Sequence, residues 1–145
     1  MYWPGWCVMI KALPIAAFVV LALLWPGWRQ PEDDLGEVVE ATAFTARVHA
    51  YAGLYSEDAP AGEIPMLVRR FEFYPPVRLQ AGQSYRLLLM AEDSVHSVAV
   101  NGREMLLMPG RVQAVEITPQ PGDEVELRCN EYCGLGHNRM RLKIY

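Results

Sequence analysis

Short segments of alternating polar and apolar residues, separated by frequent turn signals, constrain the fold of residues 31–145 more than any other feature of the sequence. The turn signals are rich in Gly, Pro and Asn: "APAGE", "YPP", "QAGQ", "NGRE", "MPGR" and "PQPGD". Alternation places side chains two apart on one face of a strand. The predicted inward rows are Phe71 with Phe73, Tyr85 with Leu87 and Leu89, His96 with Val98 and Val100, Val125 with Leu127 and Cys129, and Met140 with Leu142 and Ile144. Short strands with regular turns predict an all-β fold, a β-sandwich with one core between two sheets.

The stretch "EVVEATAFTARVHAYAG" is less decisive. It alternates from Thr42 to Tyr51, with Phe44 and Val48 on one face, which predicts a strand. A helix also fits its first half. In the strand, His49 lies on the polar side, so we do not expect it to bind a metal.

The first thirty residues carry an apolar segment from Trp6 to Trp28, "WCVMIKALPIAAFVVLALLWPGW", in which Lys11 is the only charge. A helix needs about 20 apolar residues to cross a bilayer, so residues 1–30 are predicted to form one N-terminal transmembrane helix and residues 31–145 a second domain. A cleaved signal peptide is the alternative, although no small-x-small cleavage site follows the segment. The positive-inside rule favours a cytoplasmic N-terminus. We therefore expect a single-pass protein of the cell membrane, in contact with lipid, whose second domain lies on the periplasmic side.

The charge of the second domain excludes one class of partner. Residues 31–145 contain all seventeen acidic residues and eleven of the thirteen basic ones, which leaves a formal charge of −6. Nucleic acid is therefore not an expected partner.

Side chains that bind metals gather near the end of the chain, in "CNEYCGLGHNRM", residues 129–140. By strand parity, His96, Cys129 and Met140 point inward at strand ends, while Cys133 and His137 lie on the connecting loop. Each of these residues has an ordinary explanation when it is taken singly. The histidine and the methionine could be core residues, and the two cysteines could form a disulfide in an oxidising compartment. A disulfide explains neither the short spacing to His137 and Met140 nor His96 at the head of another inward row. Together they predict a metal site.

The mixture of donor types predicts copper. Zinc would use the two cysteines and two histidines and leave Met140 idle, because a thioether is a poor zinc ligand. Thiolate, imidazole and a weak thioether suit copper, and a one-copper electron-transfer site would need only Cys133, His137, Met140 and His96. Cys129 is then an additional ligand. Two thiolates that bridge two coppers, each capped by one histidine, use both cysteines and let a shared electron move with little change in geometry.

The same segment resembles the C-x-E-x-C-G-x-x-H-x-x-M signature of the CuA centre in subunit II of heme-copper oxidases. "DSVHSVAV" resembles the strand that bears the first histidine of that family, and "MPGR" resembles the turn between its two ligand segments. The single N-terminal helix, the short chain and "CNEYCGLGH" are most similar to the compact B-type oxidases. The resemblance implies a cupredoxin-like Greek-key β-sandwich.

The resemblance also implies a ligand set for two copper ions. Cys129 and Cys133 would bridge the two ions, His96 and Met140 would complete one of them, and His137 and the backbone carbonyl of Glu131 would complete the other. Compact members often carry glutamine between the cysteines. Glu131 instead resembles the mitochondrial type, whose carboxylate helps bind magnesium at the contact with subunit I, so a magnesium ion there is a further expectation.

The implied function is that of the electron-entry subunit of a cytochrome c oxidase. A soluble c-type cytochrome or a small copper protein would donate electrons, and heme in oxidase subunit I would receive them for dioxygen reduction. The sequence has no C-x-x-C-H heme motif and no nucleotide loop, so we expect the chain to be a non-catalytic subunit of the enzyme. Leu135, Asn138 and Arg139 are candidate docking residues, with a merely solvated loop as the alternative.

Other functions stay open at this point. Some nitric oxide reductases use the same kind of electron-entry subunit, so nitric oxide is an alternative to dioxygen as the terminal electron acceptor. A membrane-tethered copper chaperone is the alternative from a different class, and an assembly subunit with a structural zinc is another.

Overall fold

The computed structural model describes residues 5–24, 35–55 and 58–145, with side chains from residue 14 onward. The chain separates into two units, residues 1–32 and 33–145, which are described one at a time.

The first unit contains α1, Gly5–Leu24. It lies within the predicted anchor, of which residues 1–4 and 25–30 are outside the described residues. Within the part of the chain that the structure describes, no helix combines the length and the apolar character needed to cross a membrane.

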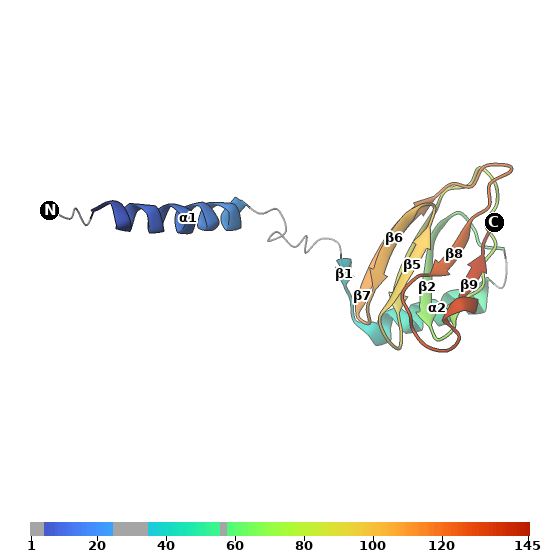
Figure 1. Cartoon of the computed structure of the whole chain (residues 1–145). Coiled ribbons are helices and arrows are strands. Elements are labelled where there is room, and N and C mark those ends of the chain that lie inside the picture. The colour runs from blue at the N-terminus through green and yellow to red at the C-terminus, as the bar shows by residue number, and fades with distance from the viewer. Residues whose placement is uncertain (1–4, 25–34, 56–57) are drawn as a thin grey trace. The chain divides into compact units, whose positions relative to one another are not determined.

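The second unit is a sandwich of two sheets, seen as two layers in Figure 1. One sheet has the order β1 (Glu37–Val38), β7 (Arg111–Ile117), β4 (Tyr85–Ala91), β2 (Gly62–Arg69) and β3 (Glu72–Tyr74). The other has the order β6 (Arg103–Leu107), β5 (His96–Val100), β8 (Glu126–Cys129) and β9 (Arg141–Lys143). Strands β2 and β4 are parallel, and the other pairs are antiparallel. The predicted β-sandwich is confirmed.

The core between the sheets is built largely from the predicted inward rows. The members that are buried in one shared cluster are Phe73, Tyr85, Leu87, Leu89, Val98, Val100, Val125, Leu127, Cys129, Met140 and Ile144. Leu142 is half-buried and packs against this cluster, and His96 is buried. Phe71 departs from the prediction: it precedes β3, is 40% exposed and does not share the buried face of Phe73.

A tight turn fixes the register of β5, the strand that carries His96. Asn101 and Gly102 both have positive φ, 50° and 72°, as a two-residue type I′ hairpin turn requires. The hairpin pairs Val100 with Arg103 next to the turn and His96 with Leu107 at its open end. This register therefore places His96 at the end of the sandwich that is remote from the turn.

The five-stranded sheet is buried on both faces, because a helix covers its outer side. In β4, Leu87 and Leu89 face the core between the sheets, while Leu88 and Met90 face a second cluster. That cluster includes Phe44 and Val48 of α2, Ala41–Leu54. Burial on both faces explains why β4 reads as a continuous apolar run rather than as an alternating one.

The prediction of a strand over residues 42–51 is wrong, since α2 occupies this stretch (Figure 1). The Glu40 carboxylate caps the helix by accepting hydrogen bonds from the backbone N–H groups of Thr42 and Ala43, at 3.1 and 2.6 Å. Phe44 and Val48, four residues apart, then lie on one helical face and pack on the sheet. His49 is exposed, and its ring lies 5.4 Å from that of Tyr74.

Shortening Val48 should destabilise this unit measurably. Val48 is fully buried between α2 and the sheet, so Val48→Ala leaves a cavity, and we expect the free energy of unfolding to fall by about 2 kcal/mol. Val38→Ala is the matched control, because Val38 is 69% exposed and should change stability by less than about 0.5 kcal/mol. Denaturant unfolding of the two variants measures both values, and equal losses would contradict the packing of α2.

Candidate metal centre

The predicted donors are supplied by two strand ends and one connecting loop. His96 opens β5, Cys129 closes β8, and Met140 directly precedes β9. A backbone hydrogen bond from Cys129 N–H to the Met140 carbonyl, 3.1 Å long, closes the base of the loop between them. His137 begins the short 3₁₀ helix η3, His137–Arg139, and Cys133 lies earlier in the loop.

All six predicted donor groups come together around two sulfur atoms. Cys129 Sγ lies 3.7 Å from Cys133 Sγ, 3.8 Å from His96 Nδ1 and 3.3 Å from the Glu131 carbonyl oxygen. Cys133 Sγ lies 3.9 Å from His137 Nδ1 and 3.6 Å from Met140 Sδ. The donor atoms of His96, Cys129 and Cys133 alone lie within 4.8 Å of one another, a spacing that could hold a metal ion.

The two cysteines are free thiols, not a disulfide. Their sulfurs lie 3.7 Å apart, whereas a disulfide bond is ~2.05 Å long. Metal–thiolate bonds of ~2.3 Å, the length known for zinc, can span sulfurs up to ~4.6 Å apart. The observed spacing therefore allows the two sulfurs to share one ion, or to share two ions that lie on opposite sides of the pair.

The donors differ in their access to water. His96, Cys129 and Met140 are buried, Cys133 and His137 are half-buried, and the Glu131 residue is exposed. Burial, followed by the neighbouring Cys133 thiol, raises the pKa of Cys129 to about 11. A metal ion that binds here must displace that proton, because the thiolate is the ligand. The donor set is thus soft and shielded, which fits copper.

Two contacts around the donors were not predicted from the sequence. The first involves Phe71, whose ring lies against the loop glycines: a Cβ added at Gly136 would stand 2.4 Å from Phe71 Cδ2, and one added at Gly134 would stand 3.0 Å from Cζ. The pair of glycines in "CGLGH" was the only sequence signal of this close approach. The Phe71 ring therefore occupies the space that a side chain at Gly136 would need and crowds the one at Gly134.

The second contact joins His96 to Asp93. His96 Nε2 lies 2.8 Å from Asp93 Oδ1, on the side of the ring away from the sulfurs. Burial by itself would raise the pKa of Asp93, but hydrogen bonds from His96 and from the Arg70 amide outweigh burial and hold this pKa below its usual value. Asp93 is therefore an anionic acceptor at neutral pH.

The predicted docking residues Leu135, Asn138 and Arg139 are all exposed, and Leu135 is 97% exposed. Tyr132, also on this loop, is 73% exposed, and its ring lies 5.9 Å from that of His137. The loop thus presents apolar side chains to solvent directly beside the donors. Docking itself stays a prediction.

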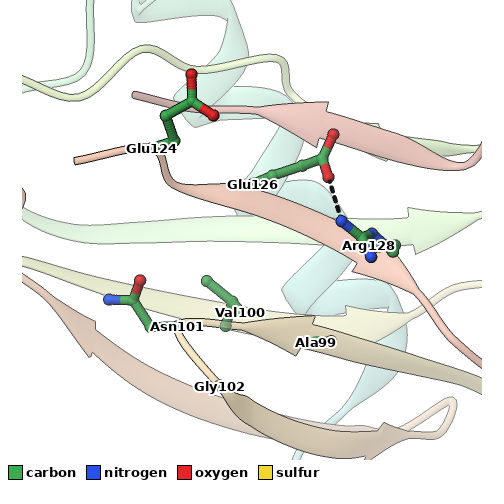
Figure 2. A pocket seen from close by; sticks show the side chains of 7 residues that line it. All are labelled: Ala99, Val100, Asn101, Gly102, Glu124, Glu126 and Arg128. Carbon is green, nitrogen blue, oxygen red and sulfur yellow. Dashed lines mark hydrogen bonds and ion pairs between the residues drawn. The ribbon is translucent and has the colours of Figure 1, made fainter. Parts of the chain in front are cut away.

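A surface depression of about 320 Å³ lies away from the donors, between the β5–β6 turn and β8. Figure 2 shows Glu124, Glu126 and Arg128 above the turn residues Asn101 and Gly102, with the 3.0 Å ion pair between Glu126 and Arg128. None of the six predicted donor residues lines it. This depression is therefore not the candidate metal centre.

About half of the chain is similar in sequence to known proteins. No family model matches the chain. It is 31% identical over 78 residues to cytochrome c oxidase subunit 2 of Thermus thermophilus, covering 52% of this chain and 58% of that protein. It is 32% identical over 72 residues to the probable cytochrome c oxidase subunit 2 of Streptomyces coelicolor, covering 48% and 23% of the two chains.

Its fold is similar to that of a chain in the cryo-EM structure of a heme-copper terminal oxidase dimer. The TM-score is 0.51 at 18% identity, over 94% of this chain and 92% of the other. The fold and the donor set define a small β-sandwich protein with a candidate site for a soft metal. More particularly, the chain is a protein similar to cytochrome c oxidase subunit 2, as the sequence resemblance predicted. It spans little more than half the length of the Thermus relative.

Proposed function

We propose that this chain is the electron-entry subunit of a membrane heme-copper oxidase, with a cupredoxin-like domain that holds a binuclear CuA centre. One observation carries the proposal: two free thiol sulfurs 3.7 Å apart are surrounded by two imidazoles, a thioether and a carbonyl. The similarity to cytochrome c oxidase subunit 2 supports it independently.

In this proposal Cys129 and Cys133 would supply thiolates to both copper ions. His96 and Met140 would be the further ligands of one ion, and His137 and the Glu131 carbonyl would be those of the other. The bound pair would supply one-electron transfer with little change in geometry. The chain's own contribution is to hold the donors in place before the metal arrives and to exclude water from them, which the burial of His96, Cys129 and Met140 supports.

Electrons would enter from a soluble c-type cytochrome or a small copper protein. The exposed apolar side chains of Tyr132 and Leu135 support docking at the loop, with Asn138 and Arg139 beside them. Electrons would leave to heme in oxidase subunit I, where dioxygen is reduced. The exposed position of Glu131 supports a contact of its carboxylate outside this chain, through magnesium at the boundary with subunit I.

The proposal includes a membrane anchor in residues 1–30, with the copper domain on the periplasmic side. The apolar sequence between Trp6 and Trp28 supports it. A copper chaperone is the alternative of a different class. The burial of His96, Cys129 and Met140 favours a permanent centre over an exchange site.

The experiment is electron transfer to the copper-loaded full-length chain in detergent. Reduced c-type cytochrome should be oxidised within milliseconds to seconds by the loaded chain and not by the metal-free chain, with one electron accepted per chain. Isolation of the chain from its native membrane should bring with it a heme-bearing subunit. Transfer of copper to an acceptor protein, without oxidation of the cytochrome, would instead identify a chaperone.

A further inference from the structure

The two nitrogen atoms of the buried His96 ring have different partners. Nδ1 faces Cys129 Sγ at 3.8 Å, whereas Nε2 faces Asp93 Oδ1 at 2.8 Å. The Ser94 hydroxyl also lies 3.3 Å from Nε2. His96 is completely shielded from solvent, so these contacts set the orientation of the ring.

Asp93 is itself held in place from a different loop. Its Oδ2 accepts a hydrogen bond of 3.1 Å from the backbone N–H of Arg70, and the Arg70 Nε lies 3.6 Å from the same oxygen. Ser94 Oγ lies 3.4 Å from Oδ1. Arg70 precedes Phe71, the residue packed against the loop glycines. Two neighbouring residues of the β2–β3 turn therefore reach the centre. Arg70 holds Asp93, which contacts His96, and Phe71 packs against the loop that carries the other donors.

We propose that Asp93 is a positioning residue for the metal centre: it accepts the Nε2–H of His96 and thereby fixes the ring with the Nδ1 lone pair directed at the sulfurs. A carboxylate that accepts the second N–H of a ligand histidine fixes its tautomer and increases its basicity. The charge-assisted bond is about twice as strong as a neutral one. The inference rests on the proposed function only in taking His96 as a copper ligand.

Glu92 is a matched control one residue away. It carries the same charge and is also ion-paired, to Arg69 at 3.0 Å, but its carboxylate bonds to Arg69 rather than to His96. Glu92→Gln therefore removes one negative charge near the centre and leaves the His96 contact intact. A general electrostatic effect would appear in both variants, and a positioning effect only in the Asp93 variants.

The test has a readout that does not need copper. In long-range ¹H–¹⁵N spectra of the metal-free full-length chain in detergent, His96 should be protonated at Nε2, and this proton should exchange slowly with water. Asp93→Ala should speed its exchange about tenfold or more, since a charge-assisted bond is lost. Asp93→Asn keeps an acceptor oxygen and should speed it less, whereas Glu92→Gln should match the parent chain.

Copper titration against a competing chelator is the second readout. Loss of such a carboxylate typically weakens metal binding about 10- to 100-fold, and we expect this for Asp93→Ala, with Glu92→Gln within about twofold of the parent. Unchanged Nε2–H exchange and unchanged affinity in Asp93→Ala would overturn the inference. If that variant does not fold, unchanged exchange in Asp93→Asn would overturn it equally. Failure of the parent chain to bind copper would refute the proposed function, while the exchange measurement would still decide the role of Asp93.

Discussion

Replacing either Cys129 or Cys133, the two proposed bridging cysteines, with serine is expected to abolish the proposed binuclear copper centre. Cys129→Ser removes a sulfur that lies within 3.9 Å of three other donor groups, Cys133→Ser removes its partner, and a hydroxyl is a hard and weakly acidic substitute for a thiolate. Each variant should lose the mixed-valence spectrum and bind at most one copper per chain. Metal analysis and electron paramagnetic resonance measure both effects.

His49→Ala is the control for the cysteine variants. His49 is exposed on α2 and its ring lies beside that of Tyr74, outside the donor cluster. Copper content and spectrum should therefore stay unchanged. A Cys129→Ser chain that still holds two coppers with the parental spectrum would show that the sulfur is not a bridge.

The second large effect is expected at Gly136. Its backbone has φ −96° and ψ 0°, which any residue can adopt, so Gly136→Ala tests space alone. The new methyl group would overlap the Phe71 ring, at 2.4 Å from Cδ2 and Cγ. Overpacking of this kind costs about 1–3 kcal/mol, so the loop should be displaced and copper affinity should fall about 5- to 150-fold.

Two further variants isolate the contact. Phe71→Ala combined with Gly136→Ala removes the overlapping ring and should recover most of the lost affinity. Gly53→Ala adds a methyl group where no atom lies within 4 Å and should leave copper binding unchanged. If the double variant bound copper as weakly as Gly136→Ala alone, the loss would not come from Phe71. Chelator competition gives all of these affinities.

The inward rows of the sandwich could be predicted because burial on one face leaves a period of two in the sequence. The same rule failed for α2. Phe44 and Val48 are four residues apart, a spacing that suits a strand face and a helix face equally, and the one alanine between them, Ala46, fits either. The Glu40 cap and the outer face of the five-stranded sheet decide in favour of the helix. Packing of the helix on the outer face of the sheet is a tertiary interaction, so the local sequence pattern cannot reveal it.

The clustering of the candidate donor residues could be predicted for the opposite reason, since most of them lie within twelve consecutive residues. The contacts that Phe71 and Asp93 make at the centre were not predicted, because these residues lie on two other loops. Phe71 was assigned to the core by parity, but it sits in the turn before β3, where alternation no longer applies. Asp93 stands three residues before His96, a spacing that gives no sign of a hydrogen bond until the chain is folded.

Copper content of the loaded chain, measured together with its electron paramagnetic resonance spectrum, distinguishes a binuclear copper centre from any other metal site. We expect two coppers per chain and, in the oxidised state, one unpaired electron shared equally by both nuclei, with a purple colour. One copper per chain with its electron localised on a single nucleus, or a preference for zinc without colour, would contradict a binuclear centre built on Cys129 and Cys133.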